Sequence, residues 1–386
     1  MVLKTAAQKS TTILRKRLEN TKQFDCFSCS DAGFDLRTNF LPKFMGDGIM
    51  KKALKMITLV LMISCFTFAG QAFGKDVLKL GFGDPINSDQ GAIAKQFKYL
   101  VESYTDGETT VQLFPGGALG NETEMLQNTR MGELDLCMLS VPNLSPFNKK
   151  INILTFPYVI TDFRDAVTIT TGKLGKMWND ILKEEAGVRI LAWTYSNFRH
   201  LTNSKRPINS MADLEGLKVR VPQNALMIET YKVWGANPTP MAWPETFTAL
   251  QQKVVDGQDN PYVVNYTMKF QEVQDYITPL HYQFSLQPMI IGEQHFQELD
   301  PELRDIVLQA GMEAQQYCVL FQKEESQKAL QAMLDEGMEL TELSDEDKMI
   351  EIAKEKVWPE YYEKVGGKDA LMEVVNELEK AKESRK

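Results

Sequence analysis

Residues 208–261 read INSMADLEGLKVRVPQNALMIETYKVWGANPTPMAWPETFTALQQKVVDGQDNP. Apolar and polar residues alternate over residues 217–221, and this spacing predicts a strand. Asn224 can accept hydrogen bonds from the first turn of a helix over residues 225–234, and Gly235 can end that helix. The first half of the stretch therefore predicts one strand followed by one helix.

The second half of the stretch repeats this order. Residues 238–241 form a short extended segment. Pro244 suits the first position of a helix that we expect to run to Gly257, with Val254 on its apolar face. A new extended segment begins near Gln258. Alternating strands and helices are typical of an α/β domain.

The same alternation precedes this stretch. Asn121 and Glu124 form a capping-box-like pair, which predicts a helix ending near Gly132. Around it we expect the following strands and amphipathic helix: a strand over 78–82, a helix marked by Ile93, Phe97, Leu100, Val101 and Tyr104, and strands over 109–114 and 134–139. This order predicts a largely parallel sheet with helices on both faces.

A long helix is predicted in the last third of the chain. Asp300 can cap it, Pro301 suits its first position, and its apolar pattern continues toward Leu334. A helix of this length is expected to lie across two domains and to brace them.

The chain has 386 residues, which is typical of two domains. We expect residues 75–196 and 285–323 to form domain I, and residues 197–284 and 324–386 to form domain II. Each domain is predicted to contain a mixed sheet flanked by helices. Hinge strands and the long helix are expected to join them.

Residues 50–74 have the order of a secretory signal peptide. A basic start precedes an uncharged apolar run over residues 56–68, and a small-residue segment follows. A buried core helix is the alternative, but the run has no polar face. We interpret residues 1–49 as a non-native or upstream extension. Lipidation at Cys65 is a further alternative, although the apolar run continues past this cysteine.

The charge of the expected mature chain limits its partners. Residues 75–386 carry 32 Lys and Arg and 47 Asp and Glu, a formal net charge of −15. Such an acidic surface argues against nucleic acids and anionic membranes as partners. An anionic ligand would need a local basic site. Cys137 and Cys318 lie in apolar surroundings and are expected in the core.

The sequence contains no recognisable catalytic pattern. It has no glycine-rich phosphate loop, no G-x-S-x-G and no H-E-x-x-H. Its three histidines are scattered, whereas metal and acid–base catalysis need clustered groups. We therefore expect no catalytic residue, no metal and no cofactor.

The central stretch closely resembles the substrate-binding proteins of tripartite ATP-independent periplasmic (TRAP) transporters, the DctP-type family. The matching segments are GLKVRVP at 216–222, GANPTPM at 235–241, Glu245 with ALQ at 249–251, and VDGQDNP at 255–261. Weaker matches lie at 114–120, 156–158 and 197–199. The resemblance extends over essentially the whole expected mature chain.

The resemblance implies the two-domain periplasmic-binding-protein fold, whose domains close on a ligand. It implies a small organic acid as the ligand, the periplasm as the location, and the small and large TRAP membrane subunits as partners. We expect a monomer that is not an enzyme. The alternatives are an ABC-type binding protein, a ligand-presenting sensor partner or a periplasmic enzyme, and a turnover assay separates the last from the others.

The resemblance also implies that Arg220 pairs with the ligand carboxylate. A guanidinium group offers paired N–H donors that match a carboxylate. Arg220 ends a predicted strand, and ligands of open α/β sheets bind at such ends. Without the resemblance, a structural arginine in a surface ion pair would be the favoured interpretation.

Further ligand-contacting residues follow from the same resemblance. Arg199 matches a position that supports the carboxylate, Asn260 a hydrogen-bonding position, and Trp243 an aromatic that packs on the ligand. A strand-end arginine, a turn asparagine and a core tryptophan are the respective alternatives. Ser140 stands where sialic-acid-binding members carry a glutamate, which argues against sialic acid. Asp84 and Gln258 are expected near the cleft.

Overall fold

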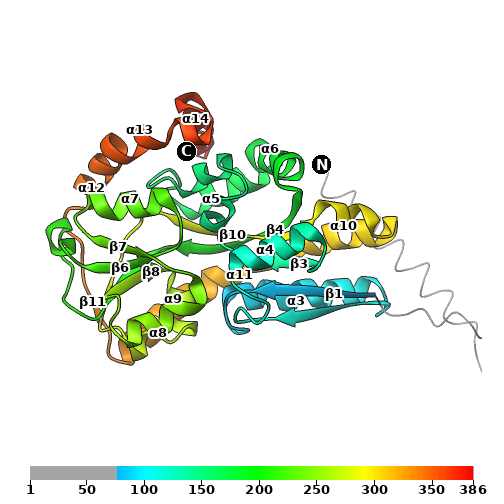
Figure 1. The fold of residues 1–386 in the computed structure, drawn as a ribbon, viewed down its shortest axis with the longest axis horizontal. Coiled ribbons are helices and arrows are strands. Elements are labelled where there is room, and N and C mark those ends of the chain that lie inside the picture. The colour runs from blue at the N-terminus through cyan, green and yellow to red at the C-terminus, as the bar shows by residue number, and fades with distance from the viewer. Residues whose placement is uncertain (1–75, 386) are drawn as a thin grey trace, which may run out of the picture. The chain divides into compact units, whose positions relative to one another are not determined.

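The computed structural model describes residues 76–385, so the predicted extension (1–49) and signal peptide (50–74) lie outside the described residues. Within 76–385, none of the helices combines the length and apolarity that a membrane crossing requires. This part of the chain contains two β-sheets, each flanked by helices (Figure 1). The predicted mixed α/β class and two-sheet architecture are confirmed.

The first sheet has five strands in the order β2-β1-β3-β10-β4. Its strands are β1 (Asp76–Phe82), β2 (Thr109–Phe114), β3 (Leu136–Met138), β4 (Val188–Phe198) and β10 (Phe284–Gly292). β1 runs parallel to β2 and β3, whereas β10 runs antiparallel to β3 and β4. The sheet is therefore mixed, because the late strand β10 enters it between β3 and β4.

Helices cover both faces of the first sheet. Its helices are α3 (Asp89–Tyr104), α4 (Glu122–Met131), α5 (Phe163–Thr171), α6 (Lys173–Ile181) and α10 (Glu293–Glu298). Leu136 and Met138 pack with α3 on one face, while Cys137 and Leu139 pack with α4, α5 and α6 on the other. This alternation follows from the two-residue period of a strand.

The predicted capping box of α4 is confirmed. The Asn121 side chain accepts hydrogen bonds from the backbone N–H groups of Thr123 and Glu124, and the Glu124 carboxylate accepts one from the Asn121 N–H. Gly132 ends the helix with a φ of 78°, a left-handed conformation that favours glycine. Local sequence thus determines both ends of α4.

The second sheet has six strands in the order β11-β9-β5-β8-β6-β7. Its strands are β5 (His200–Asn203), β6 (Lys218–Val221), β7 (Asn237–Pro240), β8 (Gly257–Asn260), β9 (Tyr276–Thr278) and β11 (Glu339–Leu340). β6 runs parallel to β7 and β8, and β5 runs antiparallel to β8 and β9. The central stretch of sequence thus supplies three strands of this sheet.

The helices of the central stretch, and one helix directly after it, flank the second sheet. They are α7 (Ala225–Val233), the one-turn helix η6 (Trp243–Glu245), α8 (Thr246–Gln251) and α9 (Tyr262–Thr267). α8 ends six residues before the expected Gly257, because Lys253 adopts a left-handed φ of 59°. Val254 is 52% exposed, so its apolar spacing did not indicate a buried helical face.

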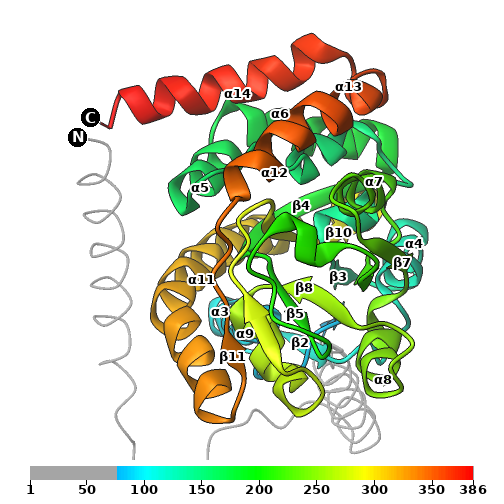
Figure 2. The ribbon, with the colours of Figure 1, turned by 90° about the vertical axis from the view of Figure 1, so that its left-hand side faces the viewer.

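The predicted long helix is α11 (Pro301–Asp335). Its first half packs on the first sheet, where Val307, Ala310 and Ala314 join the cluster around β1 and α3. Its second half packs beside the second sheet, where Ala329 and Met333 contact the cluster around α9 and β9. The prediction that this helix braces both sheets is confirmed (Figure 2).

Of the C-terminal helices, the last two pack with the apolar cluster of the first sheet, whereas the first packs with that of the second sheet through Met349. They are α12 (Glu346–Ile352), α13 (Trp358–Tyr361) and α14 (Lys368–Glu383). Leu371, Val374 and Leu378 of α14 belong to the same apolar cluster as α5 and α6, and α14 lies beside α5 (Figure 2). The proposed boundaries of the two domains stay a prediction.

Within residues 76–385 the strands pass from one sheet to the other at three places: between β4 and β5, between β9 and β10, and between β10 and β11 along α11. The first two crossings lie side by side, since the Arg199 N–H donates to the Gln283 carbonyl at 3.0 Å. Both crossings continue into the long antiparallel pair β4–β10, which begins at Phe198 and Phe284. These strands are the hinge strands that the fold prediction included.

Candidate ligand-binding site

A polar cavity lies between the two sheets. About 300 Å³ around its lining residues is not filled by atoms, a volume that includes the opening of the cavity to solvent. Its lining residues are Asp84, Glu122, Ser140, Arg199, Arg220, Pro222, Trp243, Asn260 and Gln287. Six of the seven site residues expected from the sequence are therefore brought together, and Gln258 is the exception.

Strand ends position most of these side chains. From the first sheet, Asp84 follows β1 and Ser140 follows β3. From the second sheet, Arg220 lies in β6, Asn260 ends β8, and Trp243 follows β7. The carboxyl ends of strands from both sheets thus meet at one place, which is where open α/β sheets bind ligands.

Arg220 is buried without an ion-pair partner in the described part of the chain. It is 2% exposed, and its Nη2 donates to the Met241 carbonyl at 2.8 Å. Its guanidinium carbon lies 5.3 Å from the centre of the Trp243 ring, within the range of a cation–π contact. Burial, followed by the positive charge of Arg199, lowers the pKa of Arg220 to about 10.

Arg199, in contrast, is paired by the protein itself. Its Nε donates to Asp259 Oδ2 at 2.9 Å, and its Nη2 donates to Asp259 Oδ1 at 3.2 Å. The hydroxyl of Tyr282 also donates to this carboxylate, at 2.5 Å. Burial, the largest single effect, would lower the pKa of Arg199, but Asp259 together with Tyr282 and Tyr231 outweighs it and the pKa is raised.

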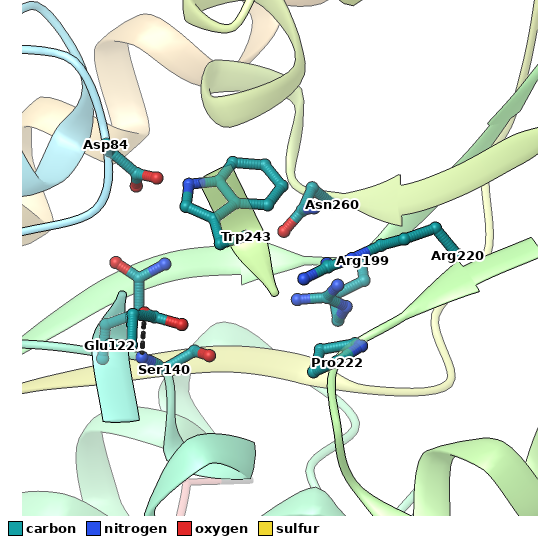
Figure 3. Close-up of a pocket in the computed structure, with 9 residues that line it drawn as sticks. Asp84, Glu122, Ser140, Arg199, Arg220, Pro222, Trp243 and Asn260 are labelled. Atoms are coloured by element: carbon teal, nitrogen blue, oxygen red, sulfur yellow. Dashed lines mark hydrogen bonds between the residues drawn. The ribbon is translucent and has the colours of Figure 1, made fainter. Parts of the chain in front are cut away.

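Two carboxyl groups lie opposite the arginines. Figure 3 shows Asp84 and Glu122 on one side of the cavity and the guanidinium groups of Arg199 and Arg220 on the other. Glu122 accepts hydrogen bonds from the Ser140 N–H at 2.8 Å and from the Asn143 side chain. Burial raises the pKa of Glu122. Burial, reinforced by Asp89 and Glu122, raises the pKa of Asp84 well above its usual value.

Gln258 lies behind the wall of the cavity and not in it. Its Oε1 accepts a hydrogen bond from the Asn260 side chain at 2.7 Å, and its Nε2 donates to Thr202 and Asn265, each at 2.9 Å. The Asn260 side-chain oxygen is left on the cavity side (Figure 3). Gln258 therefore orients Asn260 and has no free polar atom to offer a ligand.

Four buried polar atoms around the cavity lack a well-formed hydrogen bond within the described residues, although the Trp243 indole N–H lies near enough to the Asp84 carboxylate to lower the pKa of Asp84 in part. They are Asp84 Oδ2, Arg220 Nε, Trp243 Nε1 and Gln287 Oε1. A buried polar group without a partner costs about 1–3 kcal/mol. Two of these atoms are donors and two are acceptors, so the cavity can satisfy a small polar molecule that carries both kinds of group.

The model of bacterial extracellular solute-binding protein family 7 (DctP) matches residues 83–365. The chain belongs to this family. The match includes all nine residues that line the cavity. The predicted relationship to TRAP substrate-binding proteins is thereby confirmed.

The names of several relatives in the DctP family state the acid that each relative binds. The chain is 31% identical to the 2,3-diketo-L-gulonate-binding periplasmic protein YiaO of Escherichia coli, over 74% of this chain and 88% of that protein. A TRAP solute-binding protein of a Polaromonas species, bound to D-erythronate, is 31% identical, with a TM-score of 0.73 over 78% of this chain and 98% of that one. DctPAm of Advenella mimigardefordensis, with galactonate, is 28% identical, with a TM-score of 0.76 over 79% and 98%.

A second pocket adjoins the cavity in this DctP-family fold. About 630 Å³ around its lining residues is not filled by atoms, a volume that includes its opening to solvent, and it shares Glu122, Arg220 and Trp243 with the first. Its other lining residues are Asn121, Thr123, Glu124, Asn143, Gln223, Met241 and Ala242. These three shared side chains therefore lie between the inner cavity and the outer one. Residues from the parts of the chain around both sheets line the outer cavity.

Three lining residues were not expected from the sequence: Glu122, Pro222 and Gln287. Glu122 is the first residue after the cap of α4, where an acidic side chain stabilises the helix through its dipole. Its presence there therefore did not indicate a place in the cavity. Gln287 offered a clearer indication, because it is a polar residue in β10, a strand that is buried along its whole length. Among residues 76–385, no group of three or more His, Cys, Asp and Glu side chains is placed to hold a metal ion.

Proposed function

We propose that the chain is the periplasmic solute-binding subunit of a TRAP transporter. It captures a small organic acid between its two domains and delivers it to the small and large membrane subunits. Family membership and the sugar acids bound by the named relatives support the ligand class. The chain acts as an exported monomer and performs no catalysis.

The observation that carries the proposal is the unpaired charge of Arg220. A buried guanidinium is costly unless a carboxylate and further hydrogen bonds compensate it. Within the described residues no carboxylate pairs with Arg220, although Arg199 beside it has Asp259. A ligand carboxylate at the cavity would supply the missing charge and accept from the free Nε.

The other lining residues have complementary roles in this proposal. Arg199 adds positive potential near the carboxylate, and Trp243 packs against the ligand while offering its indole N–H. Asn260 and Ser140 supply further polar contacts, and Gln258 holds Asn260 in place. Asp84 lies on the opposite side, where it can accept a hydrogen bond.

Replacement of Arg220 tests the proposal. Arg220→Lys should weaken binding of the acid, and Arg220→Met should weaken it by at least about a hundredfold, because a charged pair left without one partner costs about 3–5 kcal/mol. The melting temperature of the unliganded protein should not fall, since the substitution removes a buried unpaired charge. Titration calorimetry against a panel of organic acids, with a melting curve for each variant, measures both effects.

Arg164→Met is the matched control, because this arginine is exposed on α5. It should bind the acid as the wild type does. If Arg220→Met retains affinity within a few-fold of wild type, Arg220 is not the carboxylate anchor. If the wild-type protein binds none of the acids and instead turns one over or binds another class, the proposed function is wrong.

A further inference from the structure

The indole of Trp243 fills the space that a side chain at position 83 would need. Gly83 directly follows β1 and is buried. A Cβ atom on Gly83 would lie 2.9 Å from Trp243 Cδ1 and 3.6 Å from Trp243 Nε1, whereas carbon atoms in contact are normally about 3.5–4.0 Å apart. The five-membered edge of the indole, which comes from the second sheet, therefore lies directly against the backbone of the first.

The backbone itself does not require glycine at position 83. The φ of Gly83 lies outside the left-handed region that favours glycine, so alanine could adopt this conformation. The three heavy atoms nearest to such a Cβ atom would all belong to the side chains of Trp243 and Glu122. The neighbouring ring, and not the turn after β1, therefore explains why this position lacks a side chain.

A second glycine of the first sheet meets the same one-turn helix η6. A Cβ atom on Gly117, which lies in the loop after β2, would be 3.3 Å from Pro244 Cγ. The Gly117 N–H donates to the Phe82 carbonyl at 3.0 Å, which holds the loops after β1 and β2 together. Gly83 and Gly117 thus form a surface without side chains, which we call the glycine contact surface. Since Gly117 has a left-handed φ of 68°, only Gly83 can be replaced without backbone strain.

The other side of the Trp243 ring is held by the second sheet and its helices. The Phe270 ring lies edge-on to it, with 5.9 Å between the ring centres, and the guanidinium carbon of Arg220 lies 5.3 Å from its centre. Figure 3 shows the nitrogen of the indole turned toward Asp84, on the side of the first sheet. The ring therefore extends from one sheet to the other and is in contact with both.

Trp243 also lies between the two pockets. It lines the inner cavity and the outer pocket, together with Glu122 and Arg220. Gly83 lines neither of them. A molecule that moves from the inner cavity to the outer pocket must therefore pass the indole, and displacement of the indole from the glycine contact surface would widen this passage.

We propose that Gly83 is a positioning residue for Trp243, and that the indole held against it slows the release of a bound acid. The inference rests on the proposed function, since it assumes that an acid occupies the inner cavity. Alanine at position 83 would push the indole back, so the acid should dissociate faster. Association should change less, because the acid enters before the two sheets approach each other and the indole reaches Gly83.

The rate constants of Gly83→Ala test this proposal. The probe is D-erythronate or D-galactonate, whichever binds the wild type more tightly, or else the tightest-binding acid of the organic-acid panel. Surface plasmon resonance should give a dissociation rate constant raised by at least about tenfold and an association rate constant changed by less than about threefold, the usual division for contacts within a formed complex.

Gly81→Ala is the matched control. Its Cβ atom would lie 2.8 Å from Met125 Sδ, which belongs to the core behind the first sheet and not to the cavity. The flexible thioether can move aside, so both rate constants should equal those of the wild type. The two variants add the same methyl group to neighbouring turns of the chain, and only one of them meets the indole.

A double variant shows whether the effect passes through the indole. In the Trp243→Ala background no ring meets a Cβ atom at position 83, so the addition of Gly83→Ala should leave the dissociation rate constant unchanged. If a melting curve shows that Gly83→Ala alone does not fold, the double variant should regain the fold.

Fluorine NMR of the acid-saturated protein, labelled with 5-fluorotryptophan, detects the contact itself. The chain has five tryptophans, and Trp243→Phe identifies the resonance of Trp243. Gly83→Ala should shift this resonance more than the other four, whereas Gly81→Ala should not.

The outcomes separate this inference from the proposed function. An unchanged dissociation rate constant or an unshifted Trp243 resonance in folded Gly83→Ala overturns the inference while leaving acid capture intact. The same increase with and without the indole, or loss of the fold in both the single and the double variant, also overturns it, because Gly83 would then act independently of Trp243. Failure of the wild-type protein to bind any acid of the panel refutes the proposed function itself.

Discussion

Single residues in the cavity carry charges that the protein leaves uncompensated. Arg199 and Arg220 are equally buried, each 2% exposed, yet only Arg199 has a carboxylate partner within the described residues. Asp84 is buried among other acidic groups. A structure selected for stability alone would pair or remove these charges. Their retention is consistent with a site whose ligand completes the set of partners.

The stability of the unliganded protein should report the unfavourable environment of Asp84. Its pKa in the folded protein lies well above the ordinary value of 3.8. The folded state therefore holds the proton more tightly than the unfolded state, and stability is lost as the pH rises from about 3.8 through the raised pKa. Asp84→Asn should remove this loss, with a gain of about 1–3 kcal/mol at neutral pH, the usual cost of an unsatisfied buried polar group.

Urea unfolding of both proteins between pH 3 and pH 8 checks this expectation. The gain should shrink toward zero as the pH falls to the ordinary carboxyl pKa of about 4, where Asp84 is neutral in both states. Asp305→Asn, at an exposed position on α11, should show no such dependence. A gain that is independent of pH, or a loss at neutral pH, would contradict the buried-charge explanation.

Among the secondary-structure elements, β8 forms side-chain hydrogen bonds with both segments in which the strands cross from one sheet to the other. Asp259 of β8 accepts hydrogen bonds from Arg199, at the crossing between β4 and β5, and from Tyr282, at the crossing between β9 and β10. One carboxylate of the second sheet therefore bonds side chains at both crossings. A buried pair of this kind is sensitive to loss of one partner, because the other charge stays desolvated.

Removal of that carboxylate should destabilise the fold strongly. Asp259→Asn leaves Arg199 buried without its counterion, and we expect a loss of about 3–5 kcal/mol in the free energy of unfolding. Glu373→Gln is the contrasting variant, since it breaks the exposed pair with Lys173, which has an N–O distance of 3.3 Å. An exposed pair contributes about 0–1 kcal/mol.

Chemical denaturation of the two variants at one pH measures the difference. A double substitution, Arg199→Met with Asp259→Asn, should recover part of the loss, because no charge is then left unpaired. If Asp259→Asn costs no more than Glu373→Gln, the crossing is not held by this pair.

The described molecule as a whole places its cavity between two sheets that are joined by three chain crossings, one of which is made by the helix α11. Residues from both sides line the cavity, so a ligand in contact with both favours a conformation in which the sheets approach each other. We propose hinge closure around the crossings as the response to ligand, since a few residues at element ends commonly absorb such a motion.

Small-angle X-ray scattering tests this closure. The radius of gyration of residues 75–386 should decrease when a bound acid saturates the site, because closure brings the two domains together. Arg220→Met at the same acid concentration should scatter as the unliganded protein does. An unchanged radius of gyration in the saturated wild-type protein would show that the ligand enters without domain closure.

The sequence alone determined those features that depend on neighbouring residues. The capping box defines α4, Asp300 and Pro301 begin α11, and alternation marks β1. Caps, turns and periodic apolar residues act within a few positions of the chain, so they can be recognised without the fold. The motif around Arg220 indicated the family and the end of β6, for which the relevant residues are also contiguous.

Only the tertiary structure decided which polar residues share the cavity and which of them are paired. Arg199 and Asp259 are sixty positions apart in sequence, and their pairing depends on β5 lying beside β8. An acidic residue such as Glu122 is explained by its position in the first turn of α4 alone. The sequence therefore could not predict that its side chain points toward the cavity. Desolvation and charge pairing are long-range properties of the packed chain, and for this reason they emerge only when the two sheets are placed together.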